Sequence, residues 1–238
     1  MISDLTIVIQ GRCEDDKLQM WLSNYSDWNV IISTWEEYVI PFEVPSNWKI
    51  VKSNQNEIPD FVGKNGMQNL EYQIISSLAG LNLVETKYSI KVRGDEYWSD
   101  LGKVKLDDSK LICSSMYFRP IDYHYPFHIG DHIIAGTTDN LKDMFNKTFS
   151  NLLNDVRPMN TPEVLLGWGY VQQKENLSNA EMFSICDKMI SNPYLQKWFD
   201  VIDVNELSPF ISSYKEAGSG DRKYIENYFD NCGCITKM

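Results

Sequence analysis

Residues 86–96 read Thr-Lys-Tyr-Ser-Ile-Lys-Val-Arg-Gly-Asp-Glu, the pattern of a β-strand that ends in glycine and two acidic residues. Apolar and polar side chains alternate, so one face is apolar and the other carries Lys91 and Arg93. Gly94 permits a bend and places Asp95 at the carboxyl end of the strand. The stretch predicts an edge strand, buried on one face, whose end suits a phosphate group and a divalent cation. The alternative is a solvated face followed by an acidic turn.

The composition indicates a folded, acidic protein. Its 238 residues are 43% hydrophobic and 13% aromatic, which is enough for one large α/β domain. The net charge of −11 disfavours nucleic acid as a partner. No apolar run reaches the length of about 18 residues that would indicate a membrane span, and residues 5–9 are expected to form a first strand rather than a signal peptide. Five scattered cysteines favour reduced thiols in a cytoplasmic protein.

Hydrophobic periodicity predicts an α/β fold with a mixed, mainly parallel sheet flanked by helices. The predicted strands are residues 5–9, 30–33, 49–52, 86–96, 110–114 and 133–137. The predicted helices lie near residues 18–22 and over 67–81, 139–153, a stretch beginning at 161–163, and 180–191. Asp139 is expected to cap one of these helices, and Pro162 to occupy the first turn of the next.

Polar segments follow three of the predicted parallel strands. They are Gln10-Gly11-Arg12, Ser33-Thr34-Trp35-Glu36 and Arg93-Gly94-Asp95-Glu96. Because parallel strands end at the same edge of a sheet, these segments are expected to converge on one crevice, where Trp35 would offer an aromatic face to a base or sugar. The alternative is that each segment is an ordinary polar loop.

As an ordered set, these motifs resemble the WavE family of lipopolysaccharide-synthesis proteins, regarded as nucleotide-sugar glycosyltransferases. The set comprises Ile7-Val8-Ile9-Gln10-Gly11, Ile31 to Glu36, Asn69 with Gln73 and Ser76, Thr86-Lys87-Tyr88, Lys91 to Asp95, and Pro126 to Asp131 with Gly136. The likeness covers roughly residues 5–170. It implies one GT-A-like domain over residues 1–215, with a nucleotide-binding half at about 1–100, an acceptor half at about 101–215, and a C-terminal tail at 216–238.

The resemblance also implies a donor site for a nucleotide-diphosphate sugar. Its expected residues are Gln10, Gly11, Arg12, Ser33, Thr34, Trp35, Asn69 and Gln73 for the nucleoside and sugar, and Lys91, Arg93 and Asp95 for the diphosphate. A Mn²⁺ or Mg²⁺ ion would be held by Asp95. The chain departs from the family pattern at Arg12, where proline is expected, and at Asp95-Glu96, which replaces an aspartate-x-aspartate pair. Without a metal, Lys91 and Arg93 would neutralise the leaving diphosphate.

Transfer to a glycan hydroxyl by inversion needs a carboxylate that accepts the proton. Asp131 is the first candidate, since it follows the aromatic residues Tyr123, Tyr125 and Phe127, which would hold a sugar. Glu163 is the second. Each has an ordinary structural explanation, a turn aspartate for Asp131 and the helix dipole for Glu163.

Two other functions stay open. One is a non-catalytic nucleotide- or glycan-binding module, and the other is a metal-dependent hydrolase that uses Asp95, Glu96, Asp131 and the two neighbouring histidines. A zinc site at His128 and His132 is disfavoured, because Ile129-Gly130 argues against the helix that would align them. Further acceptor-site candidates are Tyr117, Phe118 and Trp168.

Overall fold

A computed structural model describes residues 4–57, 68–115, 126–158, 161–186, 188–207 and 210–212. Several predictions fall outside this description. They concern Tyr117, Phe118, Tyr123, Tyr125, the side chain of Asn69 and the tail at 216–238.

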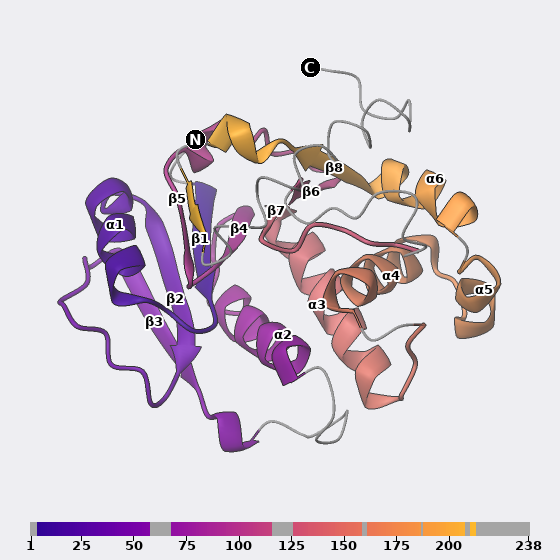
Figure 1. The fold of residues 1–238 in the computed structure, drawn as a ribbon, viewed down its shortest axis with the longest axis horizontal. Coiled ribbons are helices and arrows are strands. Elements are labelled where there is room, and N and C mark those ends of the chain that lie inside the picture. The colour runs from indigo at the N-terminus through magenta and orange to yellow at the C-terminus, as the bar shows by residue number, and fades with distance from the viewer. Residues whose placement is uncertain are drawn as a thin grey trace.

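Within the described residues, a seven-stranded sheet runs through the centre of the protein in the order β3-β2-β1-β4-β7-β6-β8 (Figure 1). The strands are β1 (Leu5–Gln10), β2 (Asn29–Trp35), β3 (Trp48–Ser53), β4 (Tyr88–Arg93), β6 (Leu111–Ser114), β7 (Ile133–Thr137) and β8 (Phe199–Ile202). In this sheet β7 is antiparallel to both its neighbours, and the other adjacent pairs are parallel. The predicted α/β class, with a mainly parallel sheet flanked by helices, is confirmed.

The remaining elements surround this sheet. The helices are α1 (Asp15–Tyr25), α2 (Gln68–Leu81), α3 (Thr138–Leu153), α4 (Pro162–Glu175), α5 (Asn179–Ser184) and α6 (Lys188–Trp198). Short 3₁₀ turns occupy Gln55–Glu57, Leu101–Lys103 and Val204–Leu207, and a separate two-stranded sheet pairs β5 (Glu96–Trp98) with β9 (Phe210–Ser212). Among the described residues, no helix has the length and apolar character needed to cross a membrane.

The strand predicted from residues 86–96 is central rather than at an edge. It forms β4, which lies between β1 and β7, and the chain then bends at Gly94 into β5. All six residues of β1 are buried, as expected for a continuous apolar run covered on both faces. The edge position predicted for residues 86–96 is therefore wrong, because the return of β7 beside β4 covers its second side.

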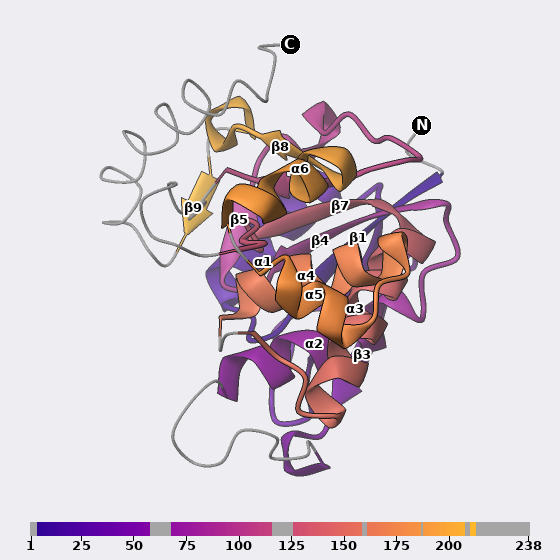
Figure 2. The ribbon, with the colours of Figure 1, turned by 90° about the vertical axis from the view of Figure 1, so that its right-hand side faces the viewer.

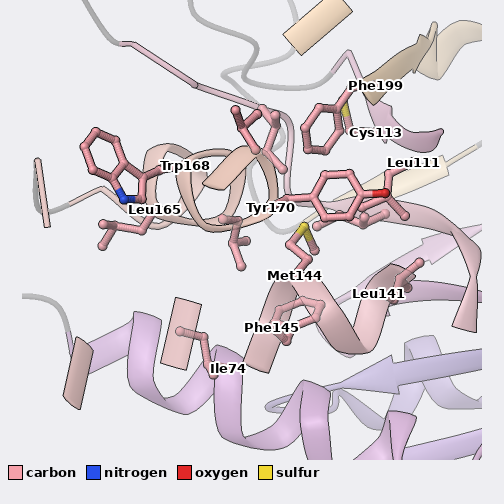
Figure 3. Packing of buried hydrophobic residues seen from close by; sticks show 14 of the residues in the cluster. Ile74, Leu111, Cys113, Leu141, Met144, Phe145, Leu165, Trp168, Tyr170 and Phe199 are labelled. Carbon is pink, nitrogen blue, oxygen red and sulfur yellow. The ribbon is translucent and has the colours of Figure 1, made fainter. Parts of the chain in front are cut away.

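Each face of the sheet has its own hydrophobic core. One core joins strand residues such as Val8 and Ile134 to α2, α3 and α4, and Figure 2 shows α3, α4 and α5 in front of the strands. In Figure 3, Met144 and Phe145 of α3 lie between Ile74 of α2 and the α4 side chain Tyr170. This layer of helices covers the face on which the polar residues of β1 and β4 also lie.

The second core lies on the opposite face, where α1 packs with β5. Leu18 and Trp21 of α1 meet Ile7 and Ile90 of the sheet. The Trp21 indole nitrogen donates a hydrogen bond of 2.9 Å to the backbone oxygen of Glu96. This bond ties α1 to the first residue of β5 and so fixes the chain immediately after Asp95.

Two helix predictions need correction. Thr137, not Asp139, caps α3, because its extended backbone lets the hydroxyl accept a hydrogen bond from the Asn140 N–H. The helix predicted over 180–191 is two helices, α5 and α6. Ser184 directs its hydroxyl to the Glu181 carbonyl oxygen, which competes with the helical ladder, and the backbone leaves the helix at Ile185. Pro162 does open α4, as predicted.

Candidate ligand site at the carboxyl ends of the sheet

The strand order reverses between β1 and β4. The chain passes from β1 to β2 and β3 on one side, and then returns to β4 on the other side of β1. In open α/β sheets, ligands bind outside the carboxyl ends of the strands at such a switch point. The residues that follow β1 and β4 are therefore the first place to look for a ligand site.

The three polar segments predicted to converge do meet at this point. Gln10 lies in register with Ser33 of β2 on one side and with Arg93 of β4 on the other. The Gly11 N–H donates to the Ser33 carbonyl oxygen at 2.9 Å, and the Gly94 N–H donates to the Gln10 carbonyl oxygen at 2.8 Å. The predicted convergence is confirmed.

Two glycines shape the turns that follow β1 and β4. Gly11 has a φ of +91°, a backbone conformation that residues other than glycine rarely adopt. A Cβ on Gly94 would lie 2.8 Å from the backbone oxygen of Arg12 and from the Cys13 sulfur, so the turns after β1 and β4 touch directly. Between these turns the side chain of Arg12 is exposed.

Gln10 and Ser33 use their side chains to hold α2 against the sheet. The Gln10 Nε2 donates to the Ser76 hydroxyl at 2.8 Å, and the Ser33 hydroxyl donates to the Ser76 carbonyl oxygen at 2.6 Å. Gln10 is 7% exposed and Ser33 is fully buried. Both residues therefore support the strand ends, and the Gln10 amide nitrogen and the Ser33 hydroxyl already have partners inside the protein.

Thr34 and Trp35 are also buried. By the alternation of the strand, Thr34 lies on the face covered by α1, away from Gln10 and Ser33. The Trp35 ring packs edge-on against Tyr72 of α2, with 5.3 Å between ring centroids. The expected open aromatic face at Trp35 is absent from this arrangement, because α2 covers the ring.

Lys91 and Asp131 form the centre of a buried polar network. The Lys91 ammonium is fully buried and donates to the backbone oxygen of Asp131 at 2.7 Å. The Asp131 carboxylate accepts a 2.7 Å hydrogen bond from the Gln73 amide nitrogen. The interpretation of residues 86–96 as a solvated face is therefore wrong for Lys91, and three predicted site residues from α2, β4 and the segment before β7 come together.

A histidine joins two carboxylates in the same network. The His132 Nδ1 lies 2.5 Å from Glu96 Oε1, and its Nε2 lies 3.9 Å from Asp131 Oδ1. Glu96 is fully buried and His132 is 3% exposed. The sequence pointed to this pair only within the hydrolase alternative. Their contact spans 36 residues and depends on how β5 and the residues before β7 are placed beside β4.

The charges of this network shift one another's pKa values. Burial alone would raise the pKa of Asp131, but His132, Lys91 and Arg93 together lower it, so Asp131 is ionised at neutral pH. Burial would lower the pKa of His132, but the charge and hydrogen bond of Glu96 raise it above the usual value. Burial lowers the pKa of Lys91 to about 8, against the opposing effect of Asp131.

Arg93 and Asp95 form a paired fork nearer the surface. The Arg93 Nε donates to Asp95 Oδ1 at 2.9 Å, and the Arg93 Nη2 donates to Asp95 Oδ2 at 2.7 Å. Their side chains are 26% and 21% exposed. Both oxygens of Asp95 are thus engaged by a guanidinium, and the described residues contain no group of three or more His, Cys, Asp or Glu side chains that could hold a metal ion. The donor set around Asp95 does not fit a divalent cation as it stands.

The acceptor-side predictions divide into a half-buried carboxylate and two core aromatics. Glu163 is half-buried in the first turn of α4, where its backbone oxygen accepts a hydrogen bond from the Ile129 N–H at 3.3 Å. Phe127 and Trp168 are fully buried and pack edge to face, with 5.6 Å between centroids. The expectation that Phe127 or Trp168 holds a sugar is wrong for this arrangement, since both rings belong to the core between the sheet and α4.

A groove of about 760 Å³ lies at the opposite end of β4, where the strand begins. It is lined by Asp4, Val84, Glu85, Thr86, Lys87, Asp108, Thr137, Thr138, Asp139, Asn140 and Lys142. Carboxylates outnumber lysines in this lining, and the Lys87 ammonium is bound to Asp108 at 2.8 Å. None of the predicted site residues lies there. The groove volume therefore favours a ligand site at one end of the sheet, and the switch-point rule favours a site at the other end. We follow the switch point, because its geometry rests on the topology of the strands.

Comparison with models of known protein families found no match, and comparison with curated proteins found no relative. The resemblance to the WavE family therefore stays a prediction from motifs.

Proposed function

We propose that the protein is a glycosyltransferase that moves a sugar from a nucleotide-diphosphate sugar to a hydroxyl of a glycan acceptor, as in the synthesis of surface polysaccharides. The observation that carries the proposal is the switch point between β1 and β4, where Arg12 follows β1 and the Arg93–Asp95 pair lies at the end of β4. A switch point of this kind is where α/β sheets bind nucleotides, and cations there suit a diphosphate.

In this proposal the donor diphosphate lies over the turns at Gly11 and Gly94. Arg12 and Arg93 would neutralise the charge that develops on the leaving diphosphate, which is the largest electrostatic demand of the reaction. Lys91 is fully buried, so it acts through its charge and by positioning Asp131 rather than by contact. Gln10 and Ser33 support the crevice by fixing α2.

The proposed base is Asp131 or Glu163, and the two residues differ in burial. Asp131 is ionised but nearly inaccessible, and its lowered pKa makes it a weak proton acceptor. Glu163 is half-buried at the first turn of α4 and adjoins the segment that carries Asp131. Glu163 is thus the less buried of the two residues as a whole, although its Oε2 atom is buried.

The experiment is a measurement of nucleotide-sugar consumption by the purified protein, with UDP-, GDP- and TDP-linked sugars, in the presence and absence of glycan acceptors. A transferase releases nucleoside diphosphate faster when an acceptor is present. Equal rates with and without acceptor would instead indicate a hydrolase and contradict the proposal. Glu163→Gln and Asp131→Asn variants then identify the base, because general base catalysis contributes roughly 100- to 10,000-fold in rate.

A second candidate, a non-catalytic nucleotide-binding module, is favoured by one observation. The amide nitrogens of Gln10 and Gln73 and the Ser33 hydroxyl all donate to partners inside the protein, so these three groups serve the fold rather than a reaction. A binding module would show saturable binding of a nucleotide sugar with no turnover under any acceptor, and Asp131→Asn would leave that binding unchanged.

A further inference from the structure

The Arg93–Asp95 ion pair at the switch point has the geometry in which an arginine binds a phosphate ligand. Arg93 and Asp95 are separated only by Gly94, yet the guanidinium grips both carboxylate oxygens through Nε and Nη2, at 2.9 and 2.7 Å. Arginine binds phosphate with the same fork of two parallel hydrogen bonds. The carboxylate of Asp95 therefore occupies the place that two phosphate oxygens would take on Arg93.

The fork belongs to a network of charged side chains. Its cations include Lys91, Arg93 and, when protonated, His132, and its carboxylates include Asp95, Glu96 and Asp131. Glu96 and Asp131 are held inside the protein by His132 and Gln73, whereas Asp95 is partly exposed. Withdrawal of Asp95 removes one negative charge from beside Arg93, so the place that it leaves attracts another anion more strongly.

We propose that Asp95 is an internal counter-anion, which fills the phosphate-binding fork of Arg93 until a diphosphate ligand displaces it. The inference deepens the proposed donor site and rests on that proposal for the ligand class. It assigns Asp95 a role opposite to that of a metal ligand. Asp95 competes with the diphosphate for Arg93, and the ligand binds to the guanidinium directly.

Displacement is feasible because the pair is partly exposed. A phosphate, with its higher charge, is a stronger partner for a guanidinium than a single carboxylate is. Rotation of the Asp95 side chain would release the guanidinium while Arg93 stays in the sheet, fixed by its register with Gln10. The counter-anion consequently costs some affinity, and it keeps a half-buried arginine paired when no ligand is present.

The test is calorimetric titration of inorganic pyrophosphate in chelator-treated buffer, with the full-length wild type and four variants. Asp95→Asn removes the competing charge and is expected to bind pyrophosphate about two- to fivefold more tightly than wild type, the range that corresponds to a weak ion pair. Asp95→Ser is a second variant with the same expectation, should Asp95→Asn fold poorly.

Arg93→Lys removes the fork while retaining the charge, and is expected to weaken binding about tenfold, since a charge-assisted hydrogen bond is lost. Asp100→Asn is the matched control, because Asp100 forms another partly exposed ion pair, with Lys103 at 2.8 Å, away from the fork. That variant is expected to bind as the wild type does.

Weaker or unchanged binding in both Asp95 variants would overturn the inference, as would an absence of pyrophosphate binding in wild type and variants alike. Tighter binding in the Asp95 variants without any sugar transfer would support the counter-anion and reject only the transferase. The two proposals can therefore fail separately.

Discussion

Lys91 shows how strongly the charged residues of this sheet depend on one another. A lysine that is fully buried in a strand is costly to charge, and its pKa is lowered to about 8. The ammonium is retained because the Asp131 backbone oxygen accepts its hydrogen bond and the Asp131 carboxylate lies close by. Residues that appear on the sequence as a solvated charge run thus form an internal network.

The lowered pKa of Lys91 predicts a gain in stability at alkaline pH. The unfolded chain keeps this proton up to about pH 10.4, whereas the folded protein releases it near pH 8, so the free energy of unfolding should rise between these values. The gain has an upper bound of about 3 kcal/mol. Urea unfolding of wild type and Lys91→Met at pH 8 and pH 10 measures this gain. The free energy of unfolding should rise between the two pH values more in wild type than in the variant. Parallel pH profiles would contradict the assignment.

The raised pKa of His132 predicts the opposite trend near neutral pH, a loss of stability as the pH rises. Because its folded pKa lies above the unfolded value of about 6.5, its stabilising interaction with Glu96 is fully present below that pH and is lost as the pH rises through the folded pKa. Wild type should therefore lose stability relative to His132→Gln as the pH increases above about 6.5. Thermal melts of both proteins over that range provide the check, and a constant difference would show that His132 does not change protonation on folding.

At the level of elements, α4 holds the segment that carries Asp131 at very short range. A Cβ on Gly167 would lie 2.0 Å from the Phe127 carbonyl oxygen, closer than any real contact. Phe127 itself has a φ of +57°, so the segment already adopts an uncommon backbone conformation to cross the helix. The position of Asp131 therefore depends on the absence of a side chain at residue 167.

Gly167→Ala is expected to reduce the free energy of unfolding by about 1–3 kcal/mol or more, as overpacking of a tight core does. Gly102→Ala is the control, because a Cβ there would meet no heavy atom closer than 3.9 Å. Denaturant titrations of both variants compare the two sites. Equal stabilities would mean that the segment at Phe127 moves without cost.

The elements that the sequence predicted well are those whose burial is decided locally. The strand at residues 133–137 is observed with those bounds, and the strand predicted at 5–9 extends to Gln10, because continuous apolar β-branched runs suit strands covered on both faces. The division of residues 180–191 into α5 and α6 was not predicted. The central place of β4 also was not predicted, since it depends on where β7 returns.

The candidate site, like the fold, was predictable only in part. Convergence of the segments after β1, β2 and β4 follows from parallel pairing alone, and it is observed. Which polar atoms remain free is a matter of packing. Gln10 and Ser33 are engaged by Ser76 of α2, and Arg93 by Asp95, and neither engagement has a signal in residue spacing.

On the scale of the whole molecule, the sheet offers two places for a ligand, one at each end of β4. The switch point has the topology and the cations, whereas the groove at Lys87 and Thr138 has the volume but an acidic lining. The proposed donor site is the first of these places. An acidic protein with a net charge of −11 can bind an anion there only through such a local cationic site.

Amide hydrogen exchange with saturating nucleoside diphosphates, UDP, GDP, ADP and CDP in turn, tests this claim most directly. We predict that at least one of them slows exchange in residues 10–14 and 93–96, where the turns after β1 and β4 meet, while residues 84–87 and 137–142 exchange as in the free protein. Protection confined to residues 84–87 and 137–142, or no protection by any of the four nucleotides, would contradict a nucleotide site at the switch point.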